Sequence, residues 1–158
     1  SYGAFQLSSA AGTLQKFLKA SKYYLKFKGM APGSATFNAQ WKLMCADKLF
    51  CDAQDNFIKI THFDPVSKYW DKLGLAHSCA IDSALFSMSV QHSYAGCMKI
   101  LDAAEAAIGA DYTDEDAIKA LYSSRSKYVS GLSMADNIKK ALLNRYKAEM
   151  ADILKIQD

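Results

Sequence analysis

The segment "SCAIDSALFSMSVQHSYAGCMKILDAAEAAI", residues 78–108, decides the fold class of this chain. It contains only four charged side chains, and its first twenty residues are almost all apolar or small. A helix that is apolar on most of its sides is a buried helix. We therefore predict that residues 78–108 form the central helix of an all-α fold, around which the other helices pack. Gly96 marks the place where we expect this helix to bend or divide.

Two amphipathic helices are predicted on the C-terminal side of this segment. In "YTDEDAIKALYSSRSKYV", residues 112–129, Thr113 and Asp116 have the spacing of a capping box. In "SMADNIKKALLNRYKAEMADILKIQD", residues 133–158, Ser133 is the expected N-cap. The positions of this last helix expected to face inward are Ile138, Leu142, Tyr146, Met150 and Ile153 or Leu154.

Helices are also predicted on the N-terminal side. Ser8 or Ser9 is expected to cap a first helix, which the turn "KGMAPGS" at 28–34 ends. Ser34 or Thr36 then begins a second helix, followed by a less regular stretch at 51–63. The apolar positions expected to face inward are Leu14, Phe17, Leu18 and Leu25 in the first helix and Phe37, Trp41, Met44, Cys45 and Leu49 in the second.

The segment "FDPVSKYWDKLG", residues 63–74, has the pattern of a short, complete helix. Asp64 is the expected N-cap, Pro65 the first helical residue and Gly74 the stop signal. No stretch alternates between apolar and polar residues as a strand does. The predicted fold class is therefore all-α.

Composition places the chain among globular domains. With 158 residues and 51% apolar side chains, residues 1–158 are expected to form a single domain with one core. The 19 basic and 16 acidic side chains give a net charge of +3 and are interspersed, so no basic stripe for nucleic acid is present. No apolar run is long enough to predict a membrane span. The apolar neighbours of Cys45, Cys51, Cys79 and Cys97 favour buried thiols over disulfides.

The familiar catalytic and metal-binding patterns are absent from the sequence. The three histidines, His62, His77 and His92, do not have zinc-ligand spacing, and no nucleophilic serine or phosphate-loop signature occurs. The acids of "DYTDEDA", residues 111–117, are explained by helix capping rather than by calcium binding. No metal and no cofactor is therefore expected.

Two groups of polar side chains resist a purely structural explanation. Tyr2 and Gln6 stand among small residues before the first helix, and Gln91, His92 and Tyr94 interrupt the apolar central segment. Buried polar groups need hydrogen-bond partners, so these side chains either bond to one another in the core or face a cleft. A cleft lined by amides, an imidazole and phenols would suit a polyhydroxylated sugar chain.

At these residues the chain resembles a known family. "SYGAFQLSSAAGTLQKFL", residues 1–18, is similar to a segment of the lysozyme-like glycosidase domains of phage lytic proteins and type VI secretion spike proteins. "SMSVQHSYAGCMKIL" resembles their central helix, and "IKALYSSRSKYV" and "NRYKAEMADIL" resemble two segments near their C-terminus. The likeness covers nearly the whole chain. More distantly, Gly3–Gln6 resembles a turn of lytic transglycosylases.

The resemblance implies a lysozyme-like helical domain that cleaves β-1,4-linked aminosugars in peptidoglycan or a chitosan-like polymer. Tyr2, Gln6, Gln91, His92 and Tyr94 would line its substrate cleft. In the family the catalytic acids, a glutamate and an aspartate, precede the S-Y-G motif. They are therefore expected before Ser1, in a longer protein of which this chain is a piece. No carboxylate within the chain has a motif that nominates it as the acid, and Glu149 is expected to pair with Arg145 or Arg125.

The resemblance also implies partners and a location. The expected partners are the cell-wall polymer and other parts of a phage tail or secretion spike, without nucleic acid or membrane insertion. The expected location is a virion or, after secretion, the bacterial periplasm. Hydrolysis and transglycosylation both remain open. The alternative is a non-catalytic saccharide-binding or structural module of such a device.

Overall fold

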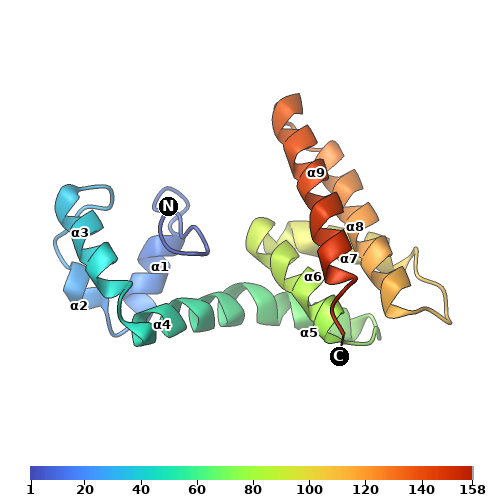
Figure 1. Cartoon of the computed structure of the whole chain (residues 1–158), viewed down its shortest axis with the longest axis horizontal. Coiled ribbons are helices and arrows are strands. Elements are labelled where there is room, and N and C mark those ends of the chain that lie inside the picture. Colours follow the sequence, from blue (N-terminus) through green and yellow to red (C-terminus); the bar gives the residue numbers. More distant parts are fainter. Residues whose placement is uncertain (158) are drawn as a thin grey trace. The chain divides into compact units, whose positions relative to one another are not determined.

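A computed structural model describes residues 1–157 of the chain, and these form helices without β-strands (Figure 1). The all-α prediction is therefore confirmed. The chain divides into two compact units, Ser1–Thr61 and His62–Asp158. Each unit is described below by itself, and the single-domain prediction stays a prediction.

The first unit is built on a cluster of aromatic side chains. Its helices are α1 (Thr13–Ala20), α2 (Tyr24–Phe27), α3 (Ala35–Met44) and α4 (Lys48–Ile58). Ser34 caps α3 by accepting a hydrogen bond from the amide of Phe37, as predicted. Edge-on, tilted and stacked ring contacts, which favour specific packing, join the side chains of Phe17, Tyr23, Phe27, Phe37, Trp41 and Phe50.

Several local expectations for this unit are wrong. Neither Ser8 nor Ser9 caps α1, because the N-cap is Gly12, in a left-handed conformation (φ 78°). Leu25 and Leu49 do not face the core and are 74% and 59% exposed. The stretch at 51–63, expected to be less regular, continues as helix through most of its length.

A π-helix, η1 (Lys59–Phe63), joins α4 directly to α5 (Asp64–Lys72), and the boundary between the two units lies within it. Asp64 is therefore not an N-cap, since the chain is already helical before it; the residue in that position is Phe63. Pro65 has no N–H to donate to the carbonyl of Thr61 four residues earlier. A wider turn before the proline is a way to accommodate that lost bond. Gly74 ends the helical segment with φ 74°, as predicted.

In the second unit, the predicted central helix is two helices, α6 (Cys79–Gln91) and α7 (Tyr94–Glu105). The division falls at His92 and Ser93, not at Gly96. His92 has an extended backbone, and the Ser93 side chain caps α7 by accepting from the amide of Gly96. α6 packs against α5, α7, α8 (Asp114–Ser130) and α9 (Asp136–Ile153). It is thus the buried centre of this unit.

The two C-terminal helices start differently. Thr113 and Asp116 form the predicted capping box at the start of α8. Ser133 does not cap α9, which begins after Ala135 without a side-chain cap. Of the expected inward positions of α9, Tyr146 and Ile153 are buried, whereas Ile138 is 51% exposed.

The cysteines are less buried than expected. Cys45 and Cys79 are exposed and Cys51 is partly exposed, so only Cys97 lies in the core. Cys45, Cys51 and Cys97 are free thiols. Burial raises the pKa of Cys97 to about 11, which makes it an unreactive core thiol.

Candidate functional site

Tyr2 and Gln6 lie in a tight N-terminal loop of the first unit. The backbones of Tyr2 and Leu7 pair through hydrogen bonds of 3.0 and 2.8 Å, and Gly3 and Gln6 have positive φ values of 71° and 52°. A Cβ atom added to Gly3 would lie 2.1 Å from Oε1 of Gln54, which is buried. The loop thus needs a glycine at this position.

The Tyr2 side chain is held by both its ring and its hydroxyl. The ring packs against those of Phe37 and Trp41, with centroids 4.9 and 5.1 Å away. The hydroxyl donates to Oδ1 of Asn38 at 2.6 Å and accepts from the Gly33 amide at 2.7 Å. Gln6 is exposed, and its amide donates to the Gly3 carbonyl at 3.2 Å. Gln6 is the more available of the two for a ligand.

Gln91 and His92 lie at the C-terminal end of α6, beside a buried arginine. Oε1 of Gln91 accepts a hydrogen bond from Nη2 of Arg125, on α8, at 2.5 Å. The same Nη2 lies 3.3 Å from Oγ of Ser87, one turn earlier in α6. Arg125 is only 2% exposed, and a charge at that depth requires partners. Arg125 is therefore the centre of a polar cluster in the second unit.

Glu149, on α9, is the acidic partner in this cluster. Its Oε1 accepts from Nη1 of Arg125 at 3.1 Å and from the hydroxyl of Tyr122 at 2.6 Å. Its Oε2 lies 3.4 Å from Nε of the more exposed Arg145. Both of the pairings considered for Glu149 are thus formed.

The environment of Glu149 keeps it ionised. Burial raises its pKa, but hydrogen bonds from Ser87 and Tyr122 and the charge of Arg125 outweigh that effect, so the pKa lies below its usual value. A general acid must hold its proton near the working pH. Glu149 has the opposite property, and it is suited to anchoring Arg125 instead.

His92 is neutral in this setting. Its Nε2 lies 3.3 Å from the hydroxyl of Tyr146, on α9, and its ring meets that of Tyr128 edge-on at 5.5 Å. Burial, and then the nearby charge of Arg125, lower the pKa of His92 to about 4. Arg125 in turn lies over the Tyr146 ring, 4.2 Å from its centroid. At neutral pH the imidazole is therefore a hydrogen-bonding group without charge.

Tyr94 lies apart from this cluster, on the surface at the start of α7, and is 55% exposed. It is near Tyr69 on α5, whose hydroxyl donates to Oδ1 of Asp102 at 2.7 Å. That hydrogen bond is the main cause of the raised pKa of Tyr69, and Tyr94 adds to it. The structure thus brings Gln91 and His92 together and places Tyr94 separately. Their roles, and those of Tyr2 and Gln6, stay predictions.

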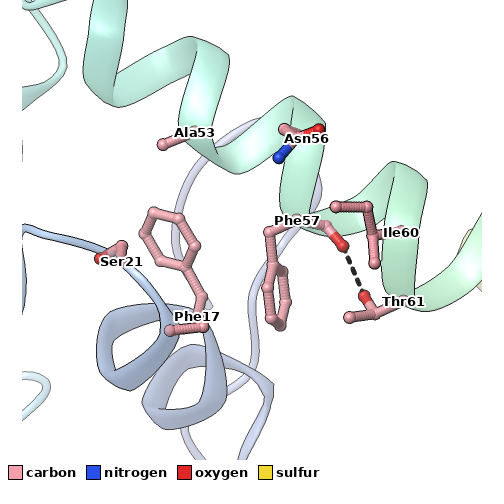
Figure 2. A pocket seen from close by; sticks show the side chains of 8 residues that line it. Phe17, Ser21, Ala53, Asn56, Phe57, Ile60 and Thr61 are labelled. Atoms are coloured by element: carbon pink, nitrogen blue, oxygen red, sulfur yellow. Dashed lines mark hydrogen bonds between the residues drawn. The ribbon is translucent and has the colours of Figure 1, made fainter.

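The first unit contains a pocket of about 270 Å³ between α1 and α4. Figure 2 shows the rings of Phe17 and Phe57 on its walls, with Asn56 above them. The Thr61 hydroxyl at one side donates to the Phe57 carbonyl at 2.6 Å. The pocket is mainly apolar, and none of its lining side chains is charged.

Within residues 1–157, no three His, Cys, Asp or Glu side chains are grouped so that they could hold a metal ion. His77 instead binds two carboxylates, with Nδ1 at Asp82 and Nε2 3.0 Å from Asp71, which links α5 to α6. Across the same described range, no helix combines the length and the apolar character needed to cross a bilayer.

Sequence reasoning missed most of the polar cluster. Arg125, Tyr122, Tyr146 and Ser87 were not expected to surround Gln91 and His92. One signal was available, since Tyr122, Arg125 and Val129 share a helix face and all three are buried. A charged residue on an apolar face indicates a buried partner elsewhere in the chain.

Comparison with known proteins identifies the family. Residues 1–150 match the family described as "Type VI secretion system spike protein VgrG3-like, C-terminal". Over 96 residues, 58% of this chain, the sequence is 33% identical to the type VI secretion system spike protein VgrG3 of Vibrio cholerae serotype O1 (strain ATCC 39315 / El Tor Inaba N16961). The aligned part spans only 9% of that relative's length. Because the family match extends over almost the whole sequence, the chain belongs to the VgrG3-like C-terminal family of type VI secretion spike proteins.

Proposed function

We propose that this chain is part of a glycosidase domain that a type VI secretion spike carries and that cleaves β-1,4 linkages between aminosugars in peptidoglycan. The observation that carries the proposal is the family match over residues 1–150. The other parts of the secretion device are its protein partners, and the periplasm of a bacterium is where it acts. The same proposal includes a lysozyme-like fold for this domain, as the resemblance of residues 1–18 implies.

In this proposal, five side chains contact the glycan. Gln6 and Tyr94 are exposed, and Gln91 and His92 are partly exposed, so each presents polar atoms at or near the surface. Tyr2 contributes an aromatic face that is held in place by its two hydroxyl hydrogen bonds. Amides and imidazoles supply the donors and acceptors that sugar hydroxyls require.

The catalytic acid is proposed to precede Ser1 in the longer protein. Glycosidases need a protonated carboxylic acid that donates to the glycosidic oxygen, and a second carboxylate that activates water or stabilises the transition state. Glu149 is ionised and held by Arg125 and Tyr122, so it is not proposed as this acid.

The experiment compares this chain with a longer piece of the encoded protein that includes the residues before Ser1. Both are incubated with purified peptidoglycan, and released fragments are quantified by chromatography. We expect release by the longer piece and little by the chain alone. The end groups of the products distinguish hydrolysis from transglycosylation, because only transglycosylation leaves anhydro ends.

The other outcomes would overturn parts of the proposal. Robust release by the chain alone would place the acid within residues 1–158. Binding of peptidoglycan by the longer piece without any release would indicate a saccharide-binding module. If neither piece binds or cleaves the polymer, a structural role in the spike would be the better reading.

A further inference from the structure

The donors and acceptors around Arg125 determine how the side-chain amide of Gln91 is oriented. A guanidinium can only donate hydrogen bonds. Since Nη2 of Arg125 lies 2.5 Å from the Gln91 side chain, the atom facing it must be the carbonyl oxygen, Oε1. The amide nitrogen of Gln91 is then turned away from Arg125. It has two protons to donate and no capacity to accept.

The next group in the chain of contacts is the hydroxyl of Tyr146, which is 1% exposed. Burial raises the pKa of this phenol, so the hydroxyl keeps its proton at pH 7. The guanidinium of Arg125 lies over the Tyr146 ring, and the Gln91 oxygen is taken by Arg125. Neither a guanidinium nor an amide nitrogen can accept a hydrogen bond. The proton of this buried hydroxyl therefore needs another acceptor, because a buried donor without one is costly.

The acceptor available to that proton is Nε2 of His92, 3.3 Å from the Tyr146 oxygen. A neutral imidazole has one protonated and one unprotonated nitrogen. If Nε2 accepts from Tyr146, the proton of the imidazole is on Nδ1. The position of the imidazole proton thus follows from the Tyr146 hydroxyl, whose hydrogen-bond partner is Nε2 of His92.

We propose that Arg125 and Tyr146 are positioning residues that hold His92 as its neutral Nδ1–H tautomer, so that Nδ1 donates a hydrogen bond to an acceptor oxygen of a bound saccharide. The tautomer follows from contacts within the second unit. The saccharide as its recipient rests on the function proposed above. An experiment can therefore refute the tautomer of His92 or the saccharide as its hydrogen-bond acceptor independently of the other.

The groups around His92 disfavour a second proton on its ring. Those that face it are Tyr146 on α9 and Arg125 and Tyr128 on α8. The thiol of Cys97, on α7, lies 3.9 Å from the backbone carbonyl of His92. Arg125 supplies a positive charge, and Cys97 is held as a neutral thiol by its raised pKa. This agrees with the low pKa of His92 and leaves the neutral ring in place at pH 7.

The test is the tautomer of His92 in the folded chain labelled with ¹⁵N-histidine. Long-range ¹H–¹⁵N correlation spectra at pH 7 distinguish a protonated ring nitrogen from an unprotonated one, and His92→Gln assigns the signals against His62 and His77. We expect a protonated Nδ1 and an unprotonated Nε2. If the spectrum of the wild-type chain shows a protonated Nε2, that result alone overturns the proposal.

Two variants test the role of Tyr146. Tyr146→Phe keeps the ring and removes the hydroxyl, so we expect the His92 signals to shift toward the Nε2–H tautomer. Tyr128→Phe is the matched control, because Tyr128 contacts His92 only through its ring. It should leave the tautomer unchanged. If Tyr146→Phe remains folded by circular dichroism and also leaves the tautomer unchanged, Tyr146 is not a positioning residue.

A titration with a soluble N-acetylglucosamine oligomer tests the recipient. We expect the Nδ1 signal of His92 to shift on saturation. Binding seen elsewhere in the spectrum without a shift at Nδ1 would refute the donor role of His92 while leaving the proposed function intact. If the tautomer is as expected and no binding occurs, the assignment of the saccharide to this site fails.

Discussion

Replacing Glu149 by alanine removes the counter-charge of Arg125 but leaves the guanidinium buried. Breaking a buried ion pair by deleting one partner typically costs about 3–5 kcal/mol. The Glu149 side chain is 19% exposed, and Arg125 keeps its contacts with Gln91 and Ser87. We therefore expect a loss near the lower end of that range, about 3 kcal/mol of the free energy of unfolding.

Two further variants test whether the burial of Arg125 causes the loss of stability expected for Glu149→Ala. Arg145→Ala removes the outer partner of the same carboxylate. Because Arg145 is 60% exposed and lies one helical turn away, we expect a loss of only about 0.3–0.5 kcal/mol. Replacing the buried pair together, by Arg125→Met with Glu149→Leu, removes both charges at once. The free energy of unfolding of this double variant is expected to lie within about 1 kcal/mol of the wild-type value.

The assay is urea denaturation followed by fluorescence of Trp70, which is fully buried in the core of the second unit. A Trp41→Phe background removes the signal of the first unit. The reasoning is refuted if Glu149→Ala costs no more than Arg145→Ala, because Arg125 would then be solvated despite its 2% exposure. It is also refuted if the double variant is as unstable as Glu149→Ala.

Three other variants test local features. Gly3→Ala should destabilise the first unit by more than about 1 kcal/mol, because φ is 71° and the new Cβ would meet Gln54; Gln54→Ala in the same chain should recover part of that loss in urea denaturation. Folding lowers the pKa of His92 from 6.5 to about 4, so the folded state disfavours its protonation. The free energy of unfolding should therefore be highest above pH 6.5 and fall as the pH is lowered toward 4. The expected loss is about 1–2 kcal/mol after discounting for partial exposure. His92→Asn should flatten this part of the pH profile. Thr113→Ala should cost about 1 kcal/mol through loss of the capping box, measured as a lower thermal midpoint.

The fold could be predicted from the sequence where one short segment decides the outcome. The capping box at Thr113, the cap at Ser34 and the stop at Gly74 each depend on a few neighbouring residues, and each is confirmed. The caps expected at Asp64 and Ser133 are wrong. A capping side chain works only if the chain before it is not helical, and at Asp64 the preceding π-helix removes that condition.

The candidate site could be predicted less well, because its contacts join distant parts of the sequence. Gln91 and His92 were expected to be either bonded in the core or facing a cleft, and the structure gives both of them partners while leaving them partly exposed. Arg125, the partner of Gln91, lies on another helix. Tyr146, the partner of His92, and Glu149, the counter-charge of Arg125, lie on a third. Helical periodicity predicts which face is apolar, but it does not predict that both Arg125 and Arg145 reach Glu149.

Stability alone does not explain why the core of the second unit contains Arg125. Apolar side chains of similar volume often fill such a position with equal or greater stability, and the Nε of Arg125 is buried without a hydrogen-bond partner. What an apolar side chain cannot do is hold the carbonyl oxygen of Gln91 and supply the positive charge that helps to keep His92 neutral. The Arg125→Met, Glu149→Leu variant separates these contributions. In the proposed function, this variant would fold with wild-type stability but bind an N-acetylglucosamine oligomer more weakly. That result would mean that the buried charge serves to orient Gln91 and His92 rather than to stabilise the fold.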